Sequence, residues 1–311
     1  MDAYLVTGGA GFIGSHLAQE LVRRGYRVRV LDSFLTGKRE NLERFRDKIE
    51  LLEGDIRNLD ICRRAVKGMD FVLHQAALPS VQSSIQDPFS TNAINVGGTL
   101  NVLWAAARAK VKKLVFDSST SVYGDDPHLP KREDMVGNPL SPYALSKWIG
   151  EKYCQIFARI YDLPTVCLRY FNVFGPRQDP LSQYAAVIPL FIIKILNGEP
   201  PVIYGDGEQT RDFVYVSNVV EANILATAAK NGPGEVFNIA CAESTTINAL
   251  VQQINAALAT DIKAVYREAR PGDIRYSLAD LSKARQMLKY QPAEDFSEGL
   301  KKTIAWYRER I

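Results

Sequence analysis

The sequence is poor in cysteine and has no long apolar run and no cluster of positive charge. Its four cysteines are scattered among 311 residues without a CxxC pair, so we expect reduced thiols in the cytoplasm rather than a disulfide framework. No window of about 18 apolar residues occurs, so no membrane-spanning helix is expected. The opening residues, MDAYLVTGG, do not resemble a signal peptide. The net charge of +3 includes no polybasic run, which argues against nucleic acid as a partner.

What remains is an ordinary globular composition, with 46% hydrophobic and 23% charged residues. The length favours one large domain with a smaller one attached. We find no fixed-period repeat and no low-complexity tract. No metal site is expected.

Short β-branched runs alternate with helical patterns in the first half of the chain. Strands are predicted at 3–7, 27–32, 49–54, 70–75, 112–118 and 165–170, and helices at about 12–24, 58–67, 89–110 and 142–162. This alternation predicts an α/β fold with a doubly wound parallel sheet of the Rossmann type.

After about residue 174 the pattern changes to loops rich in Gly, Pro and Asp, followed by helical stretches. Helices are predicted at about 184–197, 217–230, 246–258, 280–288 and 296–310. We therefore expect a Rossmann domain over 1–174, with a return of the chain at about 212–240. A smaller, mainly helical substrate lobe is expected over 175–311.

A glycine-rich turn follows the first predicted strand. In VTGGAGFIGSHL, Gly8, Gly11 and Gly14 precede a helix, so backbone N–H groups and the positive helix end would face a pyrophosphate. The spacing is GxxGxxG rather than GxGxxG. Asp32 ends the second strand, 18 residues past Gly14, where a carboxylate binds the adenosine ribose. This carboxylate would repel a 2′-phosphate, which favours NAD over NADP.

Three charged residues near this turn have alternative interpretations. Lys38 and Arg39 are cations that would suit NADP, although TGKREN also fits the solvated start of a helix. Asp55 follows the third strand and either caps the next helix or lies near the adenine. The sequence does not decide between these two roles.

Hydroxyl groups gather at the end of the fifth predicted strand. Ser118, Ser119 and Ser121 in FDSSTSVYG lie where ligands bind in open α/β sheets, beyond the carboxyl ends of the strands. The alternative is that hydroxyls cap the next turn, which would explain one of the three.

The stretch SPYALSK predicts the start of a helix. Ser141 is a good N-cap and Pro142 a good first residue, which places Tyr143 and Lys147 one turn apart on one face. An ammonium near a phenol stabilises the phenolate and lowers its pKa, so a tyrosine tuned in this way can act as a general base. Taken alone, such a pair is more often a solvated helix face.

With these motifs, the sequence resembles the extended short-chain dehydrogenase/reductase family. TGGAGFIG, SSTSVYG, YALSK and LRYFNVFGPRQDP carry the likeness in the first half, and YGDGEQTRDFVYV and RPGDIRYSLADLSKA carry it in the second. Within that family the chain looks like an NAD-dependent nucleotide-sugar 4-epimerase. It is most similar to the UDP-N-acetylglucosamine 4-epimerases, with the UDP-glucose/UDP-galactose 4-epimerases as near relatives.

The resemblance implies a reaction and a set of roles. Tyr143 would take the proton of the sugar 4-hydroxyl while bound NAD⁺ takes the C4 hydride, and hydride return to the other face would regenerate NAD⁺. Ser119 would hydrogen-bond the reacting oxygen, with help from Ser121, and Lys147 would contact the nicotinamide ribose. Further cofactor contacts are implied at Phe12, Ile13, Asp55, Ile56, Gln75, Ala76, Ala77, Asn95, Ser118, Tyr143 and Lys147.

The same resemblance implies where the UDP-sugar binds. The UDP portion falls on Asn172, Val187, Arg211, Arg270 and Asp273, and each Arg can fork onto diphosphate oxygens. Ser277 aligns with a pocket residue that is bulky in enzymes limited to UDP-glucose and UDP-galactose. A small side chain there leaves room for an N-acetyl group and predicts UDP-GlcNAc/UDP-GalNAc, with the non-acetylated pair also possible. A register slip would put Tyr276 at this position instead.

The two residues near Ser119 bear on other activities known in the family. Thr120 and Ser121 offer no acid or base, which argues against a dehydratase and against a decarboxylase of UDP-glucuronate. UDP-glucuronate 4-epimerase, a net nucleotide-sugar oxidoreductase and a non-catalytic dinucleotide sensor remain as alternatives. The resemblance also implies a homodimer formed through helices at about 92–110 and 142–162, although an apolar stripe there would equally pack on the sheet.

Overall fold

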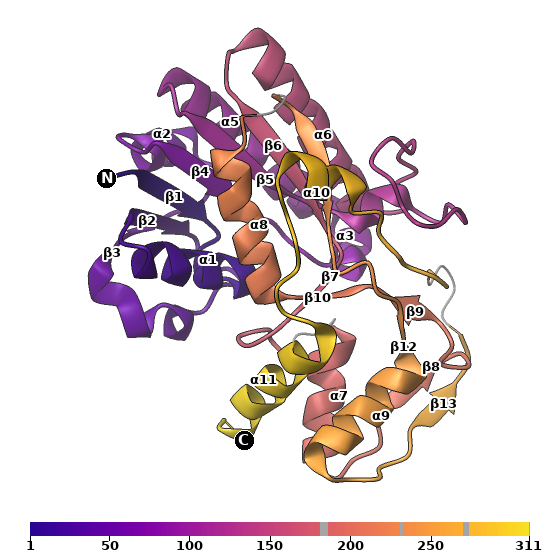
Figure 1. Ribbon diagram of the computed structural model, residues 1–311. Coiled ribbons are helices and arrows are strands. Elements are labelled where there is room, and N and C mark those ends of the chain that lie inside the picture. Colours follow the sequence, from indigo (N-terminus) through magenta and orange to yellow (C-terminus); the bar gives the residue numbers. More distant parts are fainter. Residues whose placement is uncertain (181–185, 231–232, 270–273, 311) are drawn as a thin grey trace.

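The computed structural model describes residues 1–180, 186–230, 233–269 and 274–310 (Figure 1). At its centre lies a seven-stranded sheet in the order β11-β6-β5-β4-β1-β2-β3, in which every neighbouring pair is parallel. The strands are β1 (Ala3–Thr7), β2 (Arg27–Asp32), β3 (Ile49–Glu53), β4 (Phe71–His74), β5 (Lys113–Ser119), β6 (Thr165–Tyr170) and β11 (Glu235–Ile239). The predicted doubly wound α/β fold is confirmed.

Side-chain alternation along the strands divides the core into two layers. In β1, Tyr4 and Val6 belong to one apolar cluster and Ala3 and Leu5 to the other, because successive strand residues point to opposite faces. The helices α1 (Phe12–Arg23) and α8 (Val216–Ala228) cover the first face. The helices α2 (Leu59–Val66), α5 (Thr99–Arg108) and α6 (Pro142–Ile160) cover the second.

The long helix predicted at 89–110 is wrong in detail, because the structure divides it. Two short helices, α3 (Val81–Gln86) and α4 (Pro88–Thr91), lead into a π-helical stretch at Asn92–Gly98, and α5 follows. Gly98 lies against Ile56, whose Cδ1 would be 2.5 Å from an added Cβ. Gly98 thus permits a close approach that an ordinary side chain would prevent. Turns of π-helix are often found at functional sites.

A third apolar cluster forms the lobe below the sheet in Figure 1. Its helices are α7 (Val187–Leu196), α9 (Ile247–Leu258) and α11 (Phe296–Arg308), and α10 (Ser282–Met287) packs on β11 instead. Three two-stranded sheets accompany them, formed from β7 (Asn172–Phe174), β8 (Val202–Tyr204), β9 (Thr210–Arg211), β10 (Phe213–Tyr215), β12 (Thr245–Thr246) and β13 (Val265–Arg267).

The chain returns from this lobe to the main sheet through α8 and β11 (Figure 1). The limits of the two domains themselves stay a prediction. Along the described chain, no helix combines the length and the apolar character that crossing a bilayer requires.

Candidate active site

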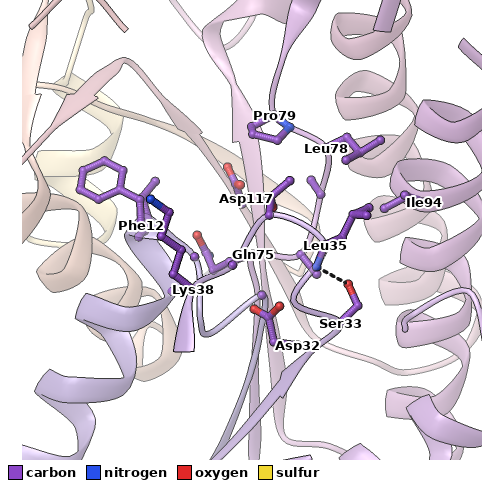
Figure 2. Close-up of a pocket in the computed structure, with 18 of the residues that line it drawn as sticks. Phe12, Asp32, Ser33, Leu35, Lys38, Gln75, Leu78, Pro79, Ile94 and Asp117 are labelled. Carbon is purple, nitrogen blue, oxygen red and sulfur yellow. Dashed lines mark hydrogen bonds between the residues drawn. The ribbon is translucent and has the colours of Figure 1, made fainter. Parts of the chain in front are cut away.

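The glycine turn after β1 forms one end of a cavity of about 730 Å³ (Figure 2). Gly8 has a φ of +66°, and an added Cβ would lie 2.8 Å from the backbone N of Ala76. A Cβ on Gly14 would lie 2.2 Å from the carbonyl oxygen of Gly8. Helix α1 begins here with Gly11 as an N-cap that makes no side-chain hydrogen bond. Its first-turn N–H groups are therefore offered to an anion.

Asp32 closes the cavity at the end of β2. Its carboxylate accepts hydrogen bonds from the backbone N–H groups of Ala10 and Phe34, both at 2.8 Å, and burial raises its pKa. The two cations that suited NADP have carboxylate partners, since Lys38 pairs with Asp179 (3.2 Å) and Arg39 with Glu53 (2.6 Å). This pairing weakens the NADP interpretation.

The structure decides between the two roles of Asp55. Asn58 is the N-cap of α2, and its side chain accepts from the N–H groups of Asp60 and Ile61. Asp55 lines the cavity and pairs with Arg57 at 2.6 Å. The capping role considered for Asp55 is therefore wrong, because a better-placed amide three residues later takes it.

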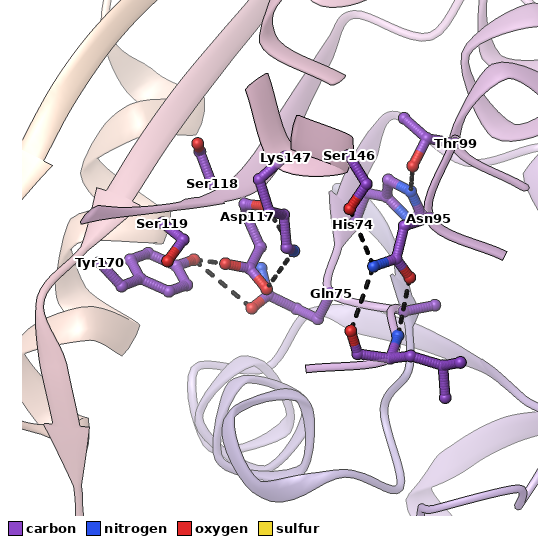
Figure 3. Close-up of polar contacts among 12 residues, drawn as sticks. His74, Gln75, Asn95, Thr99, Asp117, Ser118, Ser119, Ser146, Lys147 and Tyr170 are labelled. Carbon is purple, nitrogen blue, oxygen red and sulfur yellow. Dashed lines mark hydrogen bonds and ion pairs between the residues drawn. The ribbon is translucent and has the colours of Figure 1, made fainter. Parts of the chain in front are cut away.

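Most of the other predicted cofactor residues also line this cavity, namely Phe12, Ile13, Ile56, Gln75, Ala76 and Ala77. Asn95 lies behind the wall. Its amide accepts from Leu78 N–H (2.8 Å) and donates to Leu78 C=O and to Ser146 Oγ (both 3.1 Å), as Figure 3 shows. Asn95 therefore holds the loop after β4 rather than facing the cavity.

A second cavity, of about 810 Å³, adjoins the first at the carboxyl edge of the sheet. Phe12, Ile13, Asp117 and Gln178 line both cavities. Besides Phe12 and Ile13, six predicted site residues line the second one: Ser118, Ser119, Tyr143, Asn172, Val187 and Arg211. Two ligand groups bound in the two spaces would therefore meet at Asp117 and Phe12.

Tyr143 enters the second cavity from the first turn of α6. Ser141 caps this helix by accepting from Ala144 N–H at 3.1 Å, and Pro142 is its first residue, as predicted. The Lys147 ammonium lies 5.8 Å from the centre of the Tyr143 ring. Tyr143 and Lys147 therefore lie on one face of α6, as predicted.

The charge on Lys147 has a partner that the sequence alone did not indicate. The Lys147 ammonium donates to the backbone oxygen of Asp117 (2.8 Å) and to its carboxylate (3.1 Å). Burial raises the pKa of Tyr143, Lys147 lowers it, and Asp117 raises it again. The expected effect of Lys147 on the Tyr143 pKa is therefore present, but burial outweighs it and the net direction is upward.

The three serines at the end of β5 have different surroundings. Ser119 Oγ accepts from Ser121 N–H (3.2 Å) and from Ser121 Oγ (3.0 Å), so it caps the following turn while facing the second cavity. Ser121 supports Ser119. Ser118 is buried and donates to Glu151 at 2.6 Å, so its hydroxyl is already used and is poorly placed for the predicted cofactor contact.

The predicted UDP-binding residues are only partly described. Arg211 donates to the carbonyl oxygens of Thr210 (2.8 Å) and Ile274 (2.6 Å), which orients its guanidinium at the cavity wall. Arg270 and Asp273 lie outside the described residues. Ser277 is half-buried and its N–H donates to Thr210 Oγ1 (3.4 Å), whereas Tyr276 is 51% exposed.

Other lining residues were not predicted. Arg177, in the GPRQDP motif, lines the first cavity and donates to Ser15 Oγ (3.2 Å) and to Gln19. Burial lowers its pKa to about 10. Tyr170 and Tyr204 line the second cavity. A cation within a Gly-Pro loop after a strand is the signal that could have indicated Arg177, whereas the tyrosines look like ordinary core residues.

In the described part of the chain, His, Cys, Asp and Glu do not gather in groups of three that could hold a metal ion. Burial lowers the pKa of His74 to about 3, and its ring lies between the hydroxyls of Thr7 (2.7 Å) and Thr99 (3.0 Å).

Comparisons with known proteins agree with this geometry. Residues 4–240 match the model of the NAD dependent epimerase/dehydratase family. A UDP-glucose 4-epimerase from Mycolicibacterium smegmatis is 38% identical over 310 residues, 98% of each chain.

Two solved structures are similar along the whole chain. A UDP-N-acetylglucosamine 4-epimerase from Methanobrevibacter ruminantium in complex with UDP-N-acetylmuramic acid has a TM-score of 0.96 and 43% identity, with 100% of this chain and 99% of that chain covered. A UDP-glucose 4-epimerase from Thermus thermophilus in complex with NAD has a TM-score of 0.90 and 35% identity, with 99% of this chain and 100% of that chain covered.

Proposed function

Because the chain belongs to the NAD dependent epimerase/dehydratase family, we propose that it catalyses the reversible C4 epimerisation of a UDP-hexose. Family membership confirms the predicted resemblance, the enzyme class and NAD as the cofactor. We propose UDP-GlcNAc/UDP-GalNAc as the main sugar pair and UDP-Glc/UDP-Gal as a second pair. The observation that carries the proposal lies at the seam where the second cavity adjoins the first. Tyr143 and Ser119 line the second cavity there, and the Lys147 ammonium lies 5.8 Å from the centre of the Tyr143 ring.

The first cavity fits NAD. Its glycine turn leaves no room for a Cβ at Gly8 or Gly14, the uncapped start of α1 suits a pyrophosphate, and Asp32 suits a ribose hydroxyl. NAD bound there supplies a hydride acceptor that is restored within each turnover. We assign Gly8, Gly11, Phe12, Ile13, Gly14, Asp32, Asp55, Ile56, Gln75, Ala76 and Ala77 to its binding.

The residues at the seam have complementary roles in the proposed reaction. Tyr143 accepts the proton of the sugar 4-hydroxyl, and Ser119 donates a hydrogen bond to the same oxygen, which its bonding to Ser121 orients. Lys147 supplies positive charge beside the phenol, which favours the phenolate. As the C4 oxygen becomes a carbonyl and then a hydroxyl again, the same phenol gives the proton back.

The second cavity supplies the binding groups for the UDP portion. Arg211 presents a guanidinium, and Asn172 and Val187 line the wall beside it. Arg270 and Asp273 are proposed to complete this set. The acetylated sugar is proposed from the small side chain of Ser277, which is half-buried, whereas Tyr276 beside it is 51% exposed.

We propose that the enzyme works as a cytoplasmic homodimer. All four cysteines are free and buried, as expected in a reducing compartment. The dimer is supported by exposed apolar side chains on α4 and α6, where Phe89 is 86% and Ile160 68% exposed. Four residues on and next to α3 and α6 extend this surface: Ile85, Leu145, Ile156 and Tyr161.

Proton NMR of the purified protein with UDP-GlcNAc, and separately with UDP-Glc, tests the proposal. We expect the C4 epimer to appear without added NAD⁺. UDP-glucuronate serves as the third substrate, because the same catalytic core would suit a UDP-glucuronate 4-epimerase. Turnover of UDP-glucuronate alone would replace the proposed sugar, and release of NADH in proportion to product would replace epimerisation by net oxidation.

A further inference from the structure

A carboxylate lies in the wall that the two cavities share. Asp117 is near the end of β5 and lines both spaces. Its carboxylate and its backbone oxygen receive two hydrogen bonds from the Lys147 ammonium, as Figure 3 shows. The roles proposed so far for Ser119, Tyr143 and Lys147 make no use of this negative charge.

We propose that Asp117 is a positioning residue that supplies the counter-charge of Lys147 and so limits how far this ammonium favours the phenolate of Tyr143. This inference rests on the proposed function. It adds a fourth residue to the seam.

The geometry ties the ammonium to the carboxylate rather than to the phenol. An ammonium has three donors, and Asp117 takes two of those of Lys147. Tyr143 meets the same ammonium only through its ring, at 5.8 Å. The Lys147 side chain is 3% exposed and that of Asp117 17%, so water screens this pair little.

The titratable groups around Tyr143 come from four elements. Lys147 lies on α6, the helix that also carries Tyr143, and Asp117 lies on β5. Tyr170 on β6 and His74 on β4 lie behind them. Besides burial, Asp117 raises the pKa of Tyr170 and Lys147 lowers the pKa of His74. Helix α3 also touches Tyr143, through Ser84 Oγ and the Tyr143 N–H (3.1 Å), and carries no titratable residue.

Summing these charges leaves the surroundings of Tyr143 neutral. His74 is neutral, because burial holds its pKa at about 3, and burial raises the pKa of Tyr170 well above its ordinary range. Burial works against the charge of Lys147, but Asp117 and Tyr143 outweigh it and raise the lysine pKa. Burial raises the pKa of Asp117 and Lys147 works against this rise. With the carboxylate ionised, one ammonium and one carboxylate cancel, and burial raises the pKa of the phenol.

Titration of Tyr143 in Asp117→Asn tests the inference. The tyrosinate absorbance of the protein is measured against pH, with the matched Tyr143→Phe variant subtracted. We expect the pKa of Tyr143 to fall by about one to two units in Asp117→Asn, because a buried carboxylate near the phenol is neutralised. The acid limb of kcat against pH should move to lower pH in the same direction.

A Tyr143 pKa that is unchanged or higher in Asp117→Asn would overturn the inference, since Lys147 would then lose its charge together with its partner. Asp117→Ser provides the same measurement in a second background if the amide variant does not fold. Asp70→Asn is the control, because it removes a carboxylate from another Asp–Lys pair, with Lys112 (3.0 Å), at the amino end of the sheet, and should leave the Tyr143 titration unchanged.

The same titration is then repeated with NAD⁺ bound, so that the loaded enzyme is measured as well. With NAD⁺ bound, the pKa of Tyr143 should still be lower in Asp117→Asn than in the unsubstituted protein; equal values would contradict the inference. Because the absorbance reports on the phenol itself, it gives an answer even if no sugar is epimerised. A failure of the proposed function is therefore distinguishable from a failure of this inference.

Discussion

Two clusters of the same chemical groups lie where β5 and α6 pack together. The cavity cluster consists of Asp117, Ser119, Tyr143 and Lys147, and the sealed cluster consists of Ser118, Tyr123, Glu151 and Arg169. Each holds a carboxylate, a cation, a tyrosine and a serine. Alternation along the strand sends Ser118 to one face and its two neighbours to the other.

The sealed cluster is closed by hydrogen bonds. Arg169 donates twice to Glu151 (both 2.8 Å), and Ser118 donates once more (2.6 Å). The side chains of Arg169 and Glu151 are 4% and 1% exposed, and Tyr123 donates to Asn238 at 2.6 Å. The cavity cluster has the same parts, but its carboxylate and tyrosine line open cavities. The comparison teaches that access, rather than residue type, separates a stabilising cluster from a reactive one.

The tyrosines should differ most. In Tyr143→Phe we expect kcat for the UDP-sugar to fall about a thousandfold, because the general base is lost, with little change in the free energy of unfolding. In Tyr123→Phe we expect the unfolding free energy to fall by about 1–2 kcal/mol, because Asn238 loses a donor, with kcat nearly unchanged. Steady-state kinetics and urea denaturation of both variants measure this; similar losses of kcat in the two would break the comparison.

Substitution of the two cations, Arg169 and Lys147, should likewise affect mainly stability in one case and mainly kcat in the other. Arg169→Met leaves Glu151 buried without its partner and should cost about 3–5 kcal/mol of unfolding free energy. Lys147→Met should instead lower kcat about a hundredfold. Because Lys147 lowers the pKa of Tyr143, its removal should also move the acid limb of kcat to higher pH. Urea denaturation and a pH profile test both, and an unmoved limb would contradict the role of Lys147.

High pH should act on the sealed cluster through Tyr123. Burial raises its pKa to about 12, above the ordinary value of about 10. The unfolded chain therefore ionises first, so stability is lost as pH rises from about 10 to 12, by up to about 2.7 kcal/mol. Tyr123→Phe should show a shallower loss of the urea midpoint over this range. An identical slope in the two proteins would show that Tyr123 does not contribute.

The serines should show the smallest difference. Ser119→Ala should lower kcat about tenfold, because the reacting oxygen loses one hydrogen bond. Ser118→Ala should leave kcat almost unchanged and reduce the unfolding free energy by about 1–2 kcal/mol, because Glu151 loses a donor. A larger kcat loss in Ser118→Ala would mean that its hydroxyl faces the ligand after all.

The cavity cluster could be predicted in part from the sequence, and the sealed cluster could not. Tyr143 and Lys147 lie at the start of a helix and Ser119 lies at the end of a strand. Both patterns can be recognised from the local sequence alone. The partners of the cations depend on tertiary register instead. Ser118 lies beside Arg169 because β5 and β6 pair in parallel, and Asp117 meets Lys147 because α6 packs on β5. Neither contact follows from spacing along the chain.

The fold itself was predicted well, because its buried parallel strands are continuous apolar runs. The division of 89–110 by a π-helical stretch was missed, since it depends on the contact of Gly98 with Ile56. The assignment of the N-cap of α2 also could not be predicted from the sequence, although the two candidates, Asp55 and Asn58, are only three residues apart. Either side chain has the chemistry of an N-cap, and only the geometry assigns the cap of α2 to Asn58.

The central claim is that hydrogen leaves C4 of the sugar and returns to the same carbon within one closed site. The most direct test uses UDP-GlcNAc that carries deuterium at C4, with the protein in ordinary water. We predict that NMR of the C4 epimer finds the deuterium still at C4. An epimer that has lost the deuterium to solvent would contradict the account, because the reaction would then exchange its hydrogen with water.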